Sequence, residues 1–205
     1  IDKKALKLMP SGNVANKIFQ GSSNLVFQDR SSTWITTDTI ISGATAYGDL
    51  DNDGDLDLVS NTLNSELMVY ENLTNAKANY LKIKLDYIPD NKYGIGTKIV
   101  SFTKGIKQYK ELYTVRGFQA SSEPIIHFGY NTIEKVDSLK IIWPNATYQI
   151  IKNIDVNQTL VIKPDNTKPF NYKSLQIETK PLFKKIEDNL GIDFQHKEDV
   201  YTDFR

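Results

Sequence analysis

The sequence predicts an all-β protein, and three observations lead to this prediction. Apolar and polar residues alternate with a period of two in many short segments; in residues 79–87, Leu81 and Ile83 would share the buried face and Lys82 would lie on the other. Turn-forming residues separate these segments at intervals of about 8–12 residues. No stretch carries the helical pattern of about 10–15 residues that connects the strands of a parallel sheet. We therefore expect antiparallel strands in a sandwich or barrel-like fold.

The same alternation places the other strands. Together with a shorter strand at 66–71, it predicts strands at 97–103, 107–115, 124–128, 138–143, 147–152 and 158–163. The intervening turns are rich in Pro, Gly, Asn and Asp, as in Pro89-Asp90-Asn91. A helical period is present only weakly, at 3–9 and at 181–190.

Composition excludes several classes of protein. The chain has 205 residues with 25 Lys and Arg against 25 Asp and Glu, so it lacks the basic field of a nucleic-acid-binding protein. It has no cysteine, which excludes disulfides, thiolate zinc sites and a cysteine nucleophile. No apolar run approaches the roughly 20 residues of a transmembrane helix. We expect neither a nucleic-acid partner nor a transmembrane segment in this chain.

An acidic loop at residues 49–57 gives the clearest indication of a functional site. It reads Asp-Leu-Asp-Asn-Asp-Gly-Asp-Leu-Asp, with five carboxylates in nine positions that repel one another unless a cation or solvent offsets their charge. Oxygen ligands at alternate positions suit Ca²⁺, and Gly54 at the sixth position permits a sharp turn. The predicted ligands are the side chains of Asp49, Asp51, Asp53 and Asp57 and the main-chain oxygen of Asp55.

This loop is not an EF-hand. An EF-hand requires Glu at position 12, where this chain has Ser60, and the residues that follow the loop, Leu56, Leu58 and Val59, indicate a strand rather than a helix. We expect a calcium loop between β-strands. The alternative is an acidic turn that binds no metal.

The loop and its flanks resemble a known repeat. Residues 48–59 resemble the calcium loop of FG-GAP/VCBS repeats, which are the blades of integrin-type β-propellers. Residues 16–19 and 25–29 match the strands that begin such a repeat, and 67–72 the strand that ends one. The resemblance implies that residues 1–75 are part of a propeller blade that binds calcium.

The next block resembles the ASPIC/UnbV domain. Its motifs occur in the family's order at 95–99, 116–122, 127–129, 136–139, 143–145, 153–154 and 157–160. Tyr130, where leucine is usual, and Asn145-Ala146 depart from the pattern. The resemblance implies an ASPIC/UnbV domain at 76–165, followed at 166–205 by a linker and the start of a further repeat region.

These resemblances imply a larger protein. The chain begins without Met or a targeting segment, and 183–204 is similar to the segment that opens another propeller. We expect an internal piece of an exported bacterial protein, located outside the cell or on the outer-membrane surface, with its signal sequence outside this chain.

Three functions are consistent with the sequence. The first is a non-catalytic, calcium-binding interaction or scaffold module of a cell-surface protein, with a protein or glycan as its partner. The second is a glycan-binding or glycan-uptake accessory, which requires exposed aromatic side chains. The candidates for those are Trp34, Tyr87, Tyr93, Tyr109 and Tyr113. The third is part of a hydrolase that uses paired carboxylates.

Other residues have simpler interpretations. We expect His127 to hold the turn at Gly129 and Trp143 to be a core residue at a strand end. A triad of Ser121 or Ser122 with His127 and Asp137 lacks the strand-turn-helix context of such sites. The lysines at 104, 107 and 110 fit the charge pattern of an edge strand.

Overall fold

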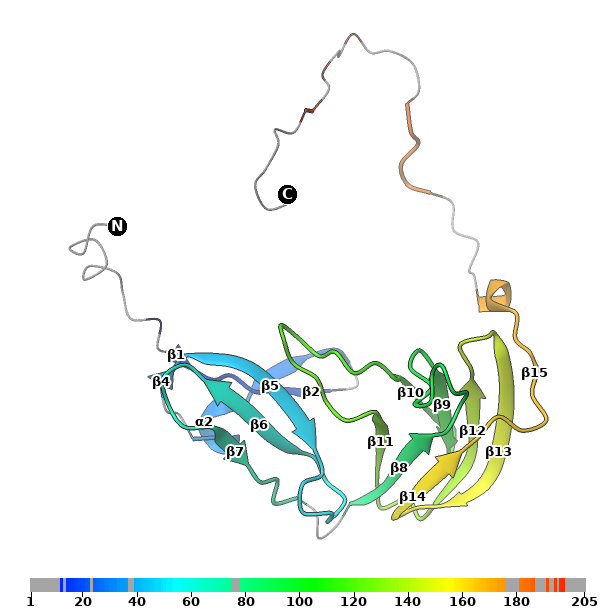
Figure 1. Cartoon of the computed structure of the whole chain (residues 1–205), viewed down its shortest axis with the longest axis horizontal. Coiled ribbons are helices and arrows are strands. Elements are labelled where there is room, and N and C mark those ends of the chain that lie inside the picture. The colour runs from blue at the N-terminus through cyan, green and yellow to red at the C-terminus, as the bar shows by residue number, and fades with distance from the viewer. Residues whose placement is uncertain are drawn as a thin grey trace. The chain divides into compact units, whose positions relative to one another are not determined.

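The computed structural model describes residues 12, 14–22, 24–36, 39–74, 78–175, 181–186, 191, 194 and 196–197. The chain divides into two units, residues 1–171 and 172–205. In the first unit the described regular structure is β except for one short helix, α2 (Ser31–Trp34) (Figure 1). In the second, a 3₁₀ helix spans Tyr172–Leu175. The prediction of an all-β protein is confirmed.

The larger sheet has five strands in the order β10-β9-β12-β13-β15, and every neighbouring pair is antiparallel. Its strands are β9 (Lys98–Thr103), β10 (Ile106–Glu111), β12 (Lys135–Ile142), β13 (Thr147–Asp155) and β15 (Lys168–Pro169). The lysine-rich strand β10 lies at one edge, as predicted. At the other edge, β15 uses two residues of the segment expected to be a linker to pair with the start of β13.

The smaller sheet of the sandwich has the order β11-β8-β14. Its strands are β8 (Asn79–Leu85), β11 (Ile125–Asn131) and β14 (Gln158–Ile162). β11 is antiparallel to β8, but β14 is parallel to it, with Leu160 opposite Ile83. The prediction of a wholly antiparallel sandwich is therefore wrong at this pair. Alternation of apolar and polar residues is the same in both arrangements, so it does not determine strand direction.

One apolar core lies between these two sheets. Leu81 and Ile83 of β8 and Phe128 of β11 meet Ile99 and Ile141 of the larger sheet, and all five are fully buried. Burial of such a side chain contributes about 1.5–3 kcal/mol. The described strands form an open sandwich and no closed barrel.

Trp143 follows β12 and is fully buried, as predicted. Its ring stacks on Tyr87 with the centroids 5.0 Å apart. Its indole N–H donates to Gln149 Oε1 over 3.0 Å. Tyr87 therefore supports the core, and it does not offer the exposed aromatic face that a glycan site would require.

The N-terminal part of the first unit contains a three-stranded antiparallel sheet, β5-β6-β7. Its strands are β5 (Ser42–Gly48), β6 (Asp57–Thr62) and β7 (Met68–Tyr70). Two further pairs precede it: β1 (Val14–Ala15) with β4 (Thr39–Ile40), and β2 (Phe19–Gly21) with β3 (Phe27–Asp29). The acidic loop connects β5 to β6, so it lies between strands as expected.

Each strand that alternation predicts between residues 66 and 163 is present. The largest difference concerns 107–115, because β10 ends at Glu111 and the next residue, Leu112, is buried in the core. Of the weak helical segments, 181–190 has no helix in its described part, residues 181–186, and 3–9 lies outside the described residues. No helix in the described part of the chain has the length and apolar character needed to cross a bilayer.

The core network around Gln149 gives a first prediction. Its Oε1 also accepts a hydrogen bond from the main-chain N–H of Asp165 (2.9 Å), and its Nε2 donates to Lys163 O (3.0 Å). Gln149→Leu would leave these groups and the Trp143 indole without partners. We expect a loss of about 2–4 kcal/mol in the free energy of unfolding, measured with urea.

Gln108→Leu is the matched control. Gln108 makes one exposed hydrogen bond, to Gly129 O, so its replacement should change the free energy of unfolding by less than about 1 kcal/mol. Equal losses in the two variants would contradict the role of the Gln149 network.

Candidate metal centre

Three of the five loop carboxylates lie together. Asp49, Asp51 and Asp53 each offer one carboxylate oxygen, and these three atoms lie within 4.8 Å of one another. Oxygens that bind one Ca²⁺ at 2.3–2.6 Å can be at most about 5 Å apart, so the spacing fits a single ion of this size.

Hydrogen bonds within the loop hold these carboxylates in place. Asp51 Oδ1 accepts from Asp53 N (3.2 Å), and Asp53 Oδ1 accepts from Asp55 N (3.0 Å). Asp49 Oδ2 accepts from Gly54 N (3.0 Å), which closes the loop. The local bonding of aspartate side chains to the backbone two residues ahead is the reason this sequence turns here.

Asp57 is not part of this group of three. It is buried at the start of β6, and its two oxygens accept from different main-chain N–H groups, Leu50 N and Asn72 N, each over 2.8 Å. It thereby joins the beginning of the loop to the segment that follows β7. Its role as a calcium ligand stays a prediction.

Asp55 also lies outside the group of three. Its Oδ2 accepts a long hydrogen bond from Thr74 Oγ1 (3.4 Å), and its Oδ1 is shielded from solvent without a partner in the described part of the chain. Burial raises the pKa of this carboxyl, and the negative charges of Asp53 and Asp57 raise it further. Ionisation of Asp55 is therefore less favourable than that of an exposed aspartate.

An ion pair attaches the loop to the sandwich. Lys82 Nζ, from β8, donates to Asp49 Oδ2, and the side chains of Lys82 and Asp49 are only 10% and 1% exposed. The sequence places Lys82 on the face of β8 opposite the core, as observed, but the acidic loop covers that face. The second carboxylate oxygen, Asp49 Oδ1, is buried and has no partner in the described residues.

Gly54 packs closely against the sandwich. Its φ of +103° is unfavourable for other residues, and a Cβ at this position would lie 1.9 Å from a ring carbon of Tyr80. Its carbonyl oxygen is 2.7 Å from Nε2 of His127. Because a carbonyl only accepts, Nε2 of His127 carries the proton.

His127 is thus a structural residue, but not in the way the sequence suggests. It supports the acidic loop at Gly54, and not the turn at Gly129. Its ring stacks on Tyr80 with the centroids 5.8 Å apart. Burial lowers its pKa from the ordinary value of 6.5, while the bond to Gly54 partly opposes that shift.

The residues considered for a catalytic triad have separate partners. Ser122 Oγ accepts from Tyr47 N (3.2 Å), and Asp137 Oδ2 accepts from Lys104 N (2.8 Å). Sequence reasoning missed Tyr80 and Lys82, which form the surface under the loop. β8 has two lysines on its polar face, Lys82 and Lys84, and no local signal in the sequence shows that only Lys82 is covered.

Comparison with known families bears on the sandwich. Residues 88–169 match the model of the ASPIC and UnbV family. The match supports an ASPIC/UnbV domain, and it includes His127 but not β8 with Tyr80 and Lys82. No FG-GAP/VCBS repeat is shown by this comparison, and no curated protein matches the chain.

The contact between Gly54 and Tyr80 gives a second prediction. Gly54→Ala should lower the free energy of unfolding by about 1–2 kcal/mol because of the positive φ. The loss should be larger still because the added Cβ would overlap the Tyr80 ring. Gly105→Ala is the control, because Gly105 also has a positive φ, of +82°, but no atom lies within 4 Å of its added Cβ. Urea unfolding should show the larger loss for Gly54→Ala, and equal losses would contradict close packing at this contact.

The buried imidazole gives a third prediction. Since the folded pKa of His127 is below 6.5, the unfolded chain binds a proton first as the pH falls, and stability declines below about pH 6.5. In urea unfolding with a chelator present, His127→Gln should reduce the slope of stability against pH between about 6.5 and the lowered pKa. His196→Gln is the control, and an unchanged slope in His127→Gln would contradict the assignment.

Proposed function

We propose that the first unit is a calcium-stabilised, non-catalytic interaction or scaffold module of an exported cell-surface protein. The observation that carries the proposal is the Asp49 carboxylate, which is almost fully buried and has one oxygen without a partner in the described residues. That carboxylate belongs to the group of three with Asp51 and Asp53. A buried, unpaired carboxylate oxygen costs about 1–3 kcal/mol or more, and a cation would remove that cost.

The donor set selects the class of cation. All the candidate ligands are carboxylate or main-chain oxygens, which hard cations prefer, and the loop has no His or Cys for zinc. Ca²⁺ accepts irregular geometry and more ligands than Mg²⁺. A cation would also favour ionisation of Asp55 beside the cluster, because burial and the charges of its neighbours raise the pKa of that carboxyl.

The bound ion would act on the junction between the loop and the sandwich. Asp49 bonds to Lys82 of β8, and Gly54 bonds to His127 of β11. Fixing Asp49, Asp51 and Asp53 around one ion would restrict both contacts. At millimolar extracellular calcium even a weak site would be filled, which fits the proposed location outside the cell or on the outer-membrane surface.

The β5-β6-β7 sheet supports the further proposal that residues 1–75 are part of an FG-GAP/VCBS-type propeller blade. The calcium-loop motif lies between two antiparallel strands of that sheet, as the resemblance implies. A propeller blade has four strands, and the described sheet has three, so the proposal includes a completing strand from elsewhere.

A glycan-binding function is the second candidate, and one observation favours it. Tyr109 and Tyr113 line the same cleft. The other candidate aromatics do not join them, because Tyr87 packs on Trp143 and Trp34 lines a different pocket.

Calorimetry with Ca²⁺ on chelator-stripped protein tests the calcium proposal. We expect a Kd on the order of 10⁻⁴–10⁻³ M. At a free Ca²⁺ concentration of about five times the Kd, the ion should raise the free energy of unfolding by about 1 kcal/mol and raise Tm by about 2–4 °C. Asp51→Asn keeps the acceptor for Asp53 N but removes a charge, so it should weaken binding by about tenfold. Asp90→Asn, which changes an exposed turn residue, should bind as the wild type does.

Lys82→Met provides an independent check. The variant removes the positive charge beside Asp49, so the calcium-free protein should lose stability while its affinity for Ca²⁺ rises. No heat and no change in Tm up to about 10 mM Ca²⁺ in the wild type would overturn the proposal.

A further inference from the structure

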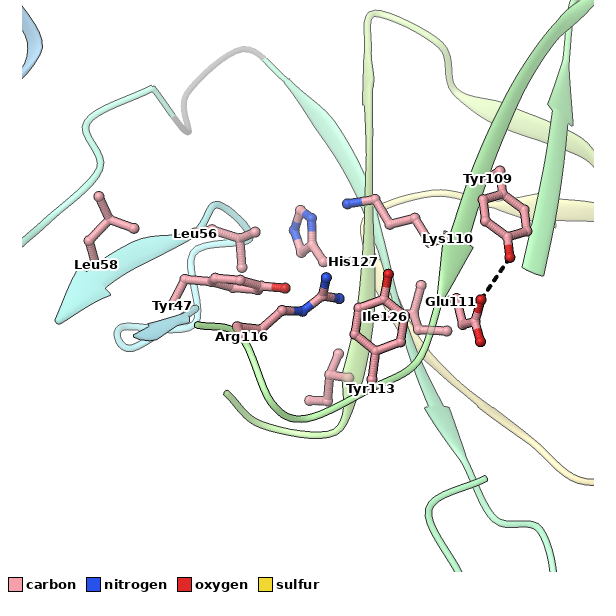
Figure 2. A pocket seen from close by; sticks show the side chains of 11 residues that line it. Tyr47, Leu56, Leu58, Tyr109, Lys110, Glu111, Tyr113, Arg116, Ile126 and His127 are labelled. Carbon is pink, nitrogen blue, oxygen red and sulfur yellow. Dashed lines mark hydrogen bonds between the residues drawn. The ribbon is translucent and has the colours of Figure 1, made fainter. Parts of the chain in front are cut away.

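A cleft of about 470 Å³ lies beside His127 (Figure 2). Its volume falls in the usual range for small-molecule sites, about 300–1,000 Å³. The residues that matter for its chemistry are Tyr47, Tyr109, Lys110, Tyr113, Arg116 and His127. None of these residues is among the predicted calcium ligands.

Arg116 is held in the cleft by two tyrosines. Its guanidinium carbon lies 4.2 Å from the ring centroid of Tyr113 and 5.9 Å from that of Tyr47. Its main-chain N–H donates to Ala120 O (3.0 Å), which fixes the backbone. Its Nε is shielded from solvent and has no acceptor in the described residues. A guanidinium held over an aromatic ring can present its terminal N–H groups to an oxygen ligand.

Lys110 supplies a second positive charge. It comes from the edge strand β10, and Figure 2 shows its ammonium and the Arg116 guanidinium pointing towards the space beside His127. Burial lowers the pKa of Lys110, and the charge of Arg116 lowers it further. Within the described part of the chain, neither cation forms an ion pair. Lys110 is an exposed residue of the edge strand, as the sequence suggests, and its ammonium reaches the cleft.

The acid in the cleft wall does not neutralise these cations. Glu111 Oε1 accepts from Lys98 Nζ (2.9 Å), and its Oε2 accepts from the Tyr109 hydroxyl (2.9 Å). The bond from Lys98 is the main reason that the pKa of Glu111 is lowered. His127 is also engaged, since its Nε2 donates to Gly54 O. The cleft therefore has an excess of positive charge.

We propose that this cleft binds an acidic sugar through its carboxylate, with Arg116 and Lys110 as the groups that recognise the charge. The guanidinium would donate to the carboxylate oxygens, and the ammonium of Lys110 would provide a second charged donor. Tyr113, which is 45% exposed, gives the site an aromatic wall for a sugar ring. A uronic acid monosaccharide fits both the charge and the volume.

The proposal is independent of the calcium site. The cleft would bind the sugar whether or not the acidic loop holds an ion. The two are neighbours because His127 contacts the loop at Gly54 and also lines the cleft.

The proposal is tested by measuring the binding of glucuronate to the full chain with calorimetry and with ligand-observed NMR. A ligand of this size should bind with a Kd of about 1 mM. Glucose should bind at least about tenfold more weakly, because it lacks the carboxylate. Acetate and inorganic phosphate separate recognition of the sugar from attraction of any anion, and both should also bind at least about tenfold more weakly.

Two variants locate the site, and one controls for charge. Arg116→Gln and Lys110→Met should each weaken glucuronate binding by at least about tenfold. Lys107→Met removes the same charge from the same strand, but Lys107 lies over Phe102 and does not line the cleft, so binding should be unchanged. Chelator-stripped wild-type protein should also bind glucuronate normally, which distinguishes this site from the calcium loop.

Several separate results would contradict the proposed sugar site. No glucuronate binding by the wild type up to about 20 mM would overturn the proposal. Binding of glucose as tight as that of glucuronate would also overturn it. Binding of acetate and phosphate as tight as that of glucuronate would overturn it too, because it would show an adventitious ion only. Normal binding by Lys110→Met, with its fold confirmed by circular dichroism, would place any site elsewhere, even if Arg116→Gln failed to fold.

Discussion

The arrangement of the first unit depends on a buried charge that must be paired. Asp49 is almost completely removed from solvent, and Lys82 is the cation that meets it. Removal of one partner from such a pair leaves an uncompensated charge and typically costs about 3–5 kcal/mol. The loop can therefore lie against β8 only while this pair is intact, and the contacts of Gly54 with Tyr80 and His127 require the same placement.

Opposite charges are separated within a chain whose formal net charge is zero. The acidic loop concentrates negative charge on one side of His127, and the cleft with Lys110 and Arg116 concentrates positive charge nearby. His127 stays uncharged more readily than a solvent-exposed histidine because burial lowers its pKa.

The sequence was a good guide wherever one face of a strand is buried. Alternation located β8, β9 and the later strands, and the spacing of aspartates located the loop between β5 and β6, because both signals are local. What could not be predicted depends on segments far apart in the chain. Lys82 was assigned to the outer face of β8, but only tertiary structure shows that the loop covers that face. Alternation indicates an edge strand at Lys110, but only the tertiary structure shows that Lys110 and Arg116 line one cleft.

The parallel pairing of β14 with β8 has a consequence for the order in which the protein forms. β8 lies between β11 and β14, and Asn157, just before β14, bonds through its side chain to the main chain of Tyr80, which is 77 residues away. During synthesis, β8 therefore emerges long before the strand that completes its sheet. Closing so long a loop is slow, and the apolar face of β8 needs protection until it is complete. The acidic loop contacts His127 of β11, so that contact can form only after β11 has been made.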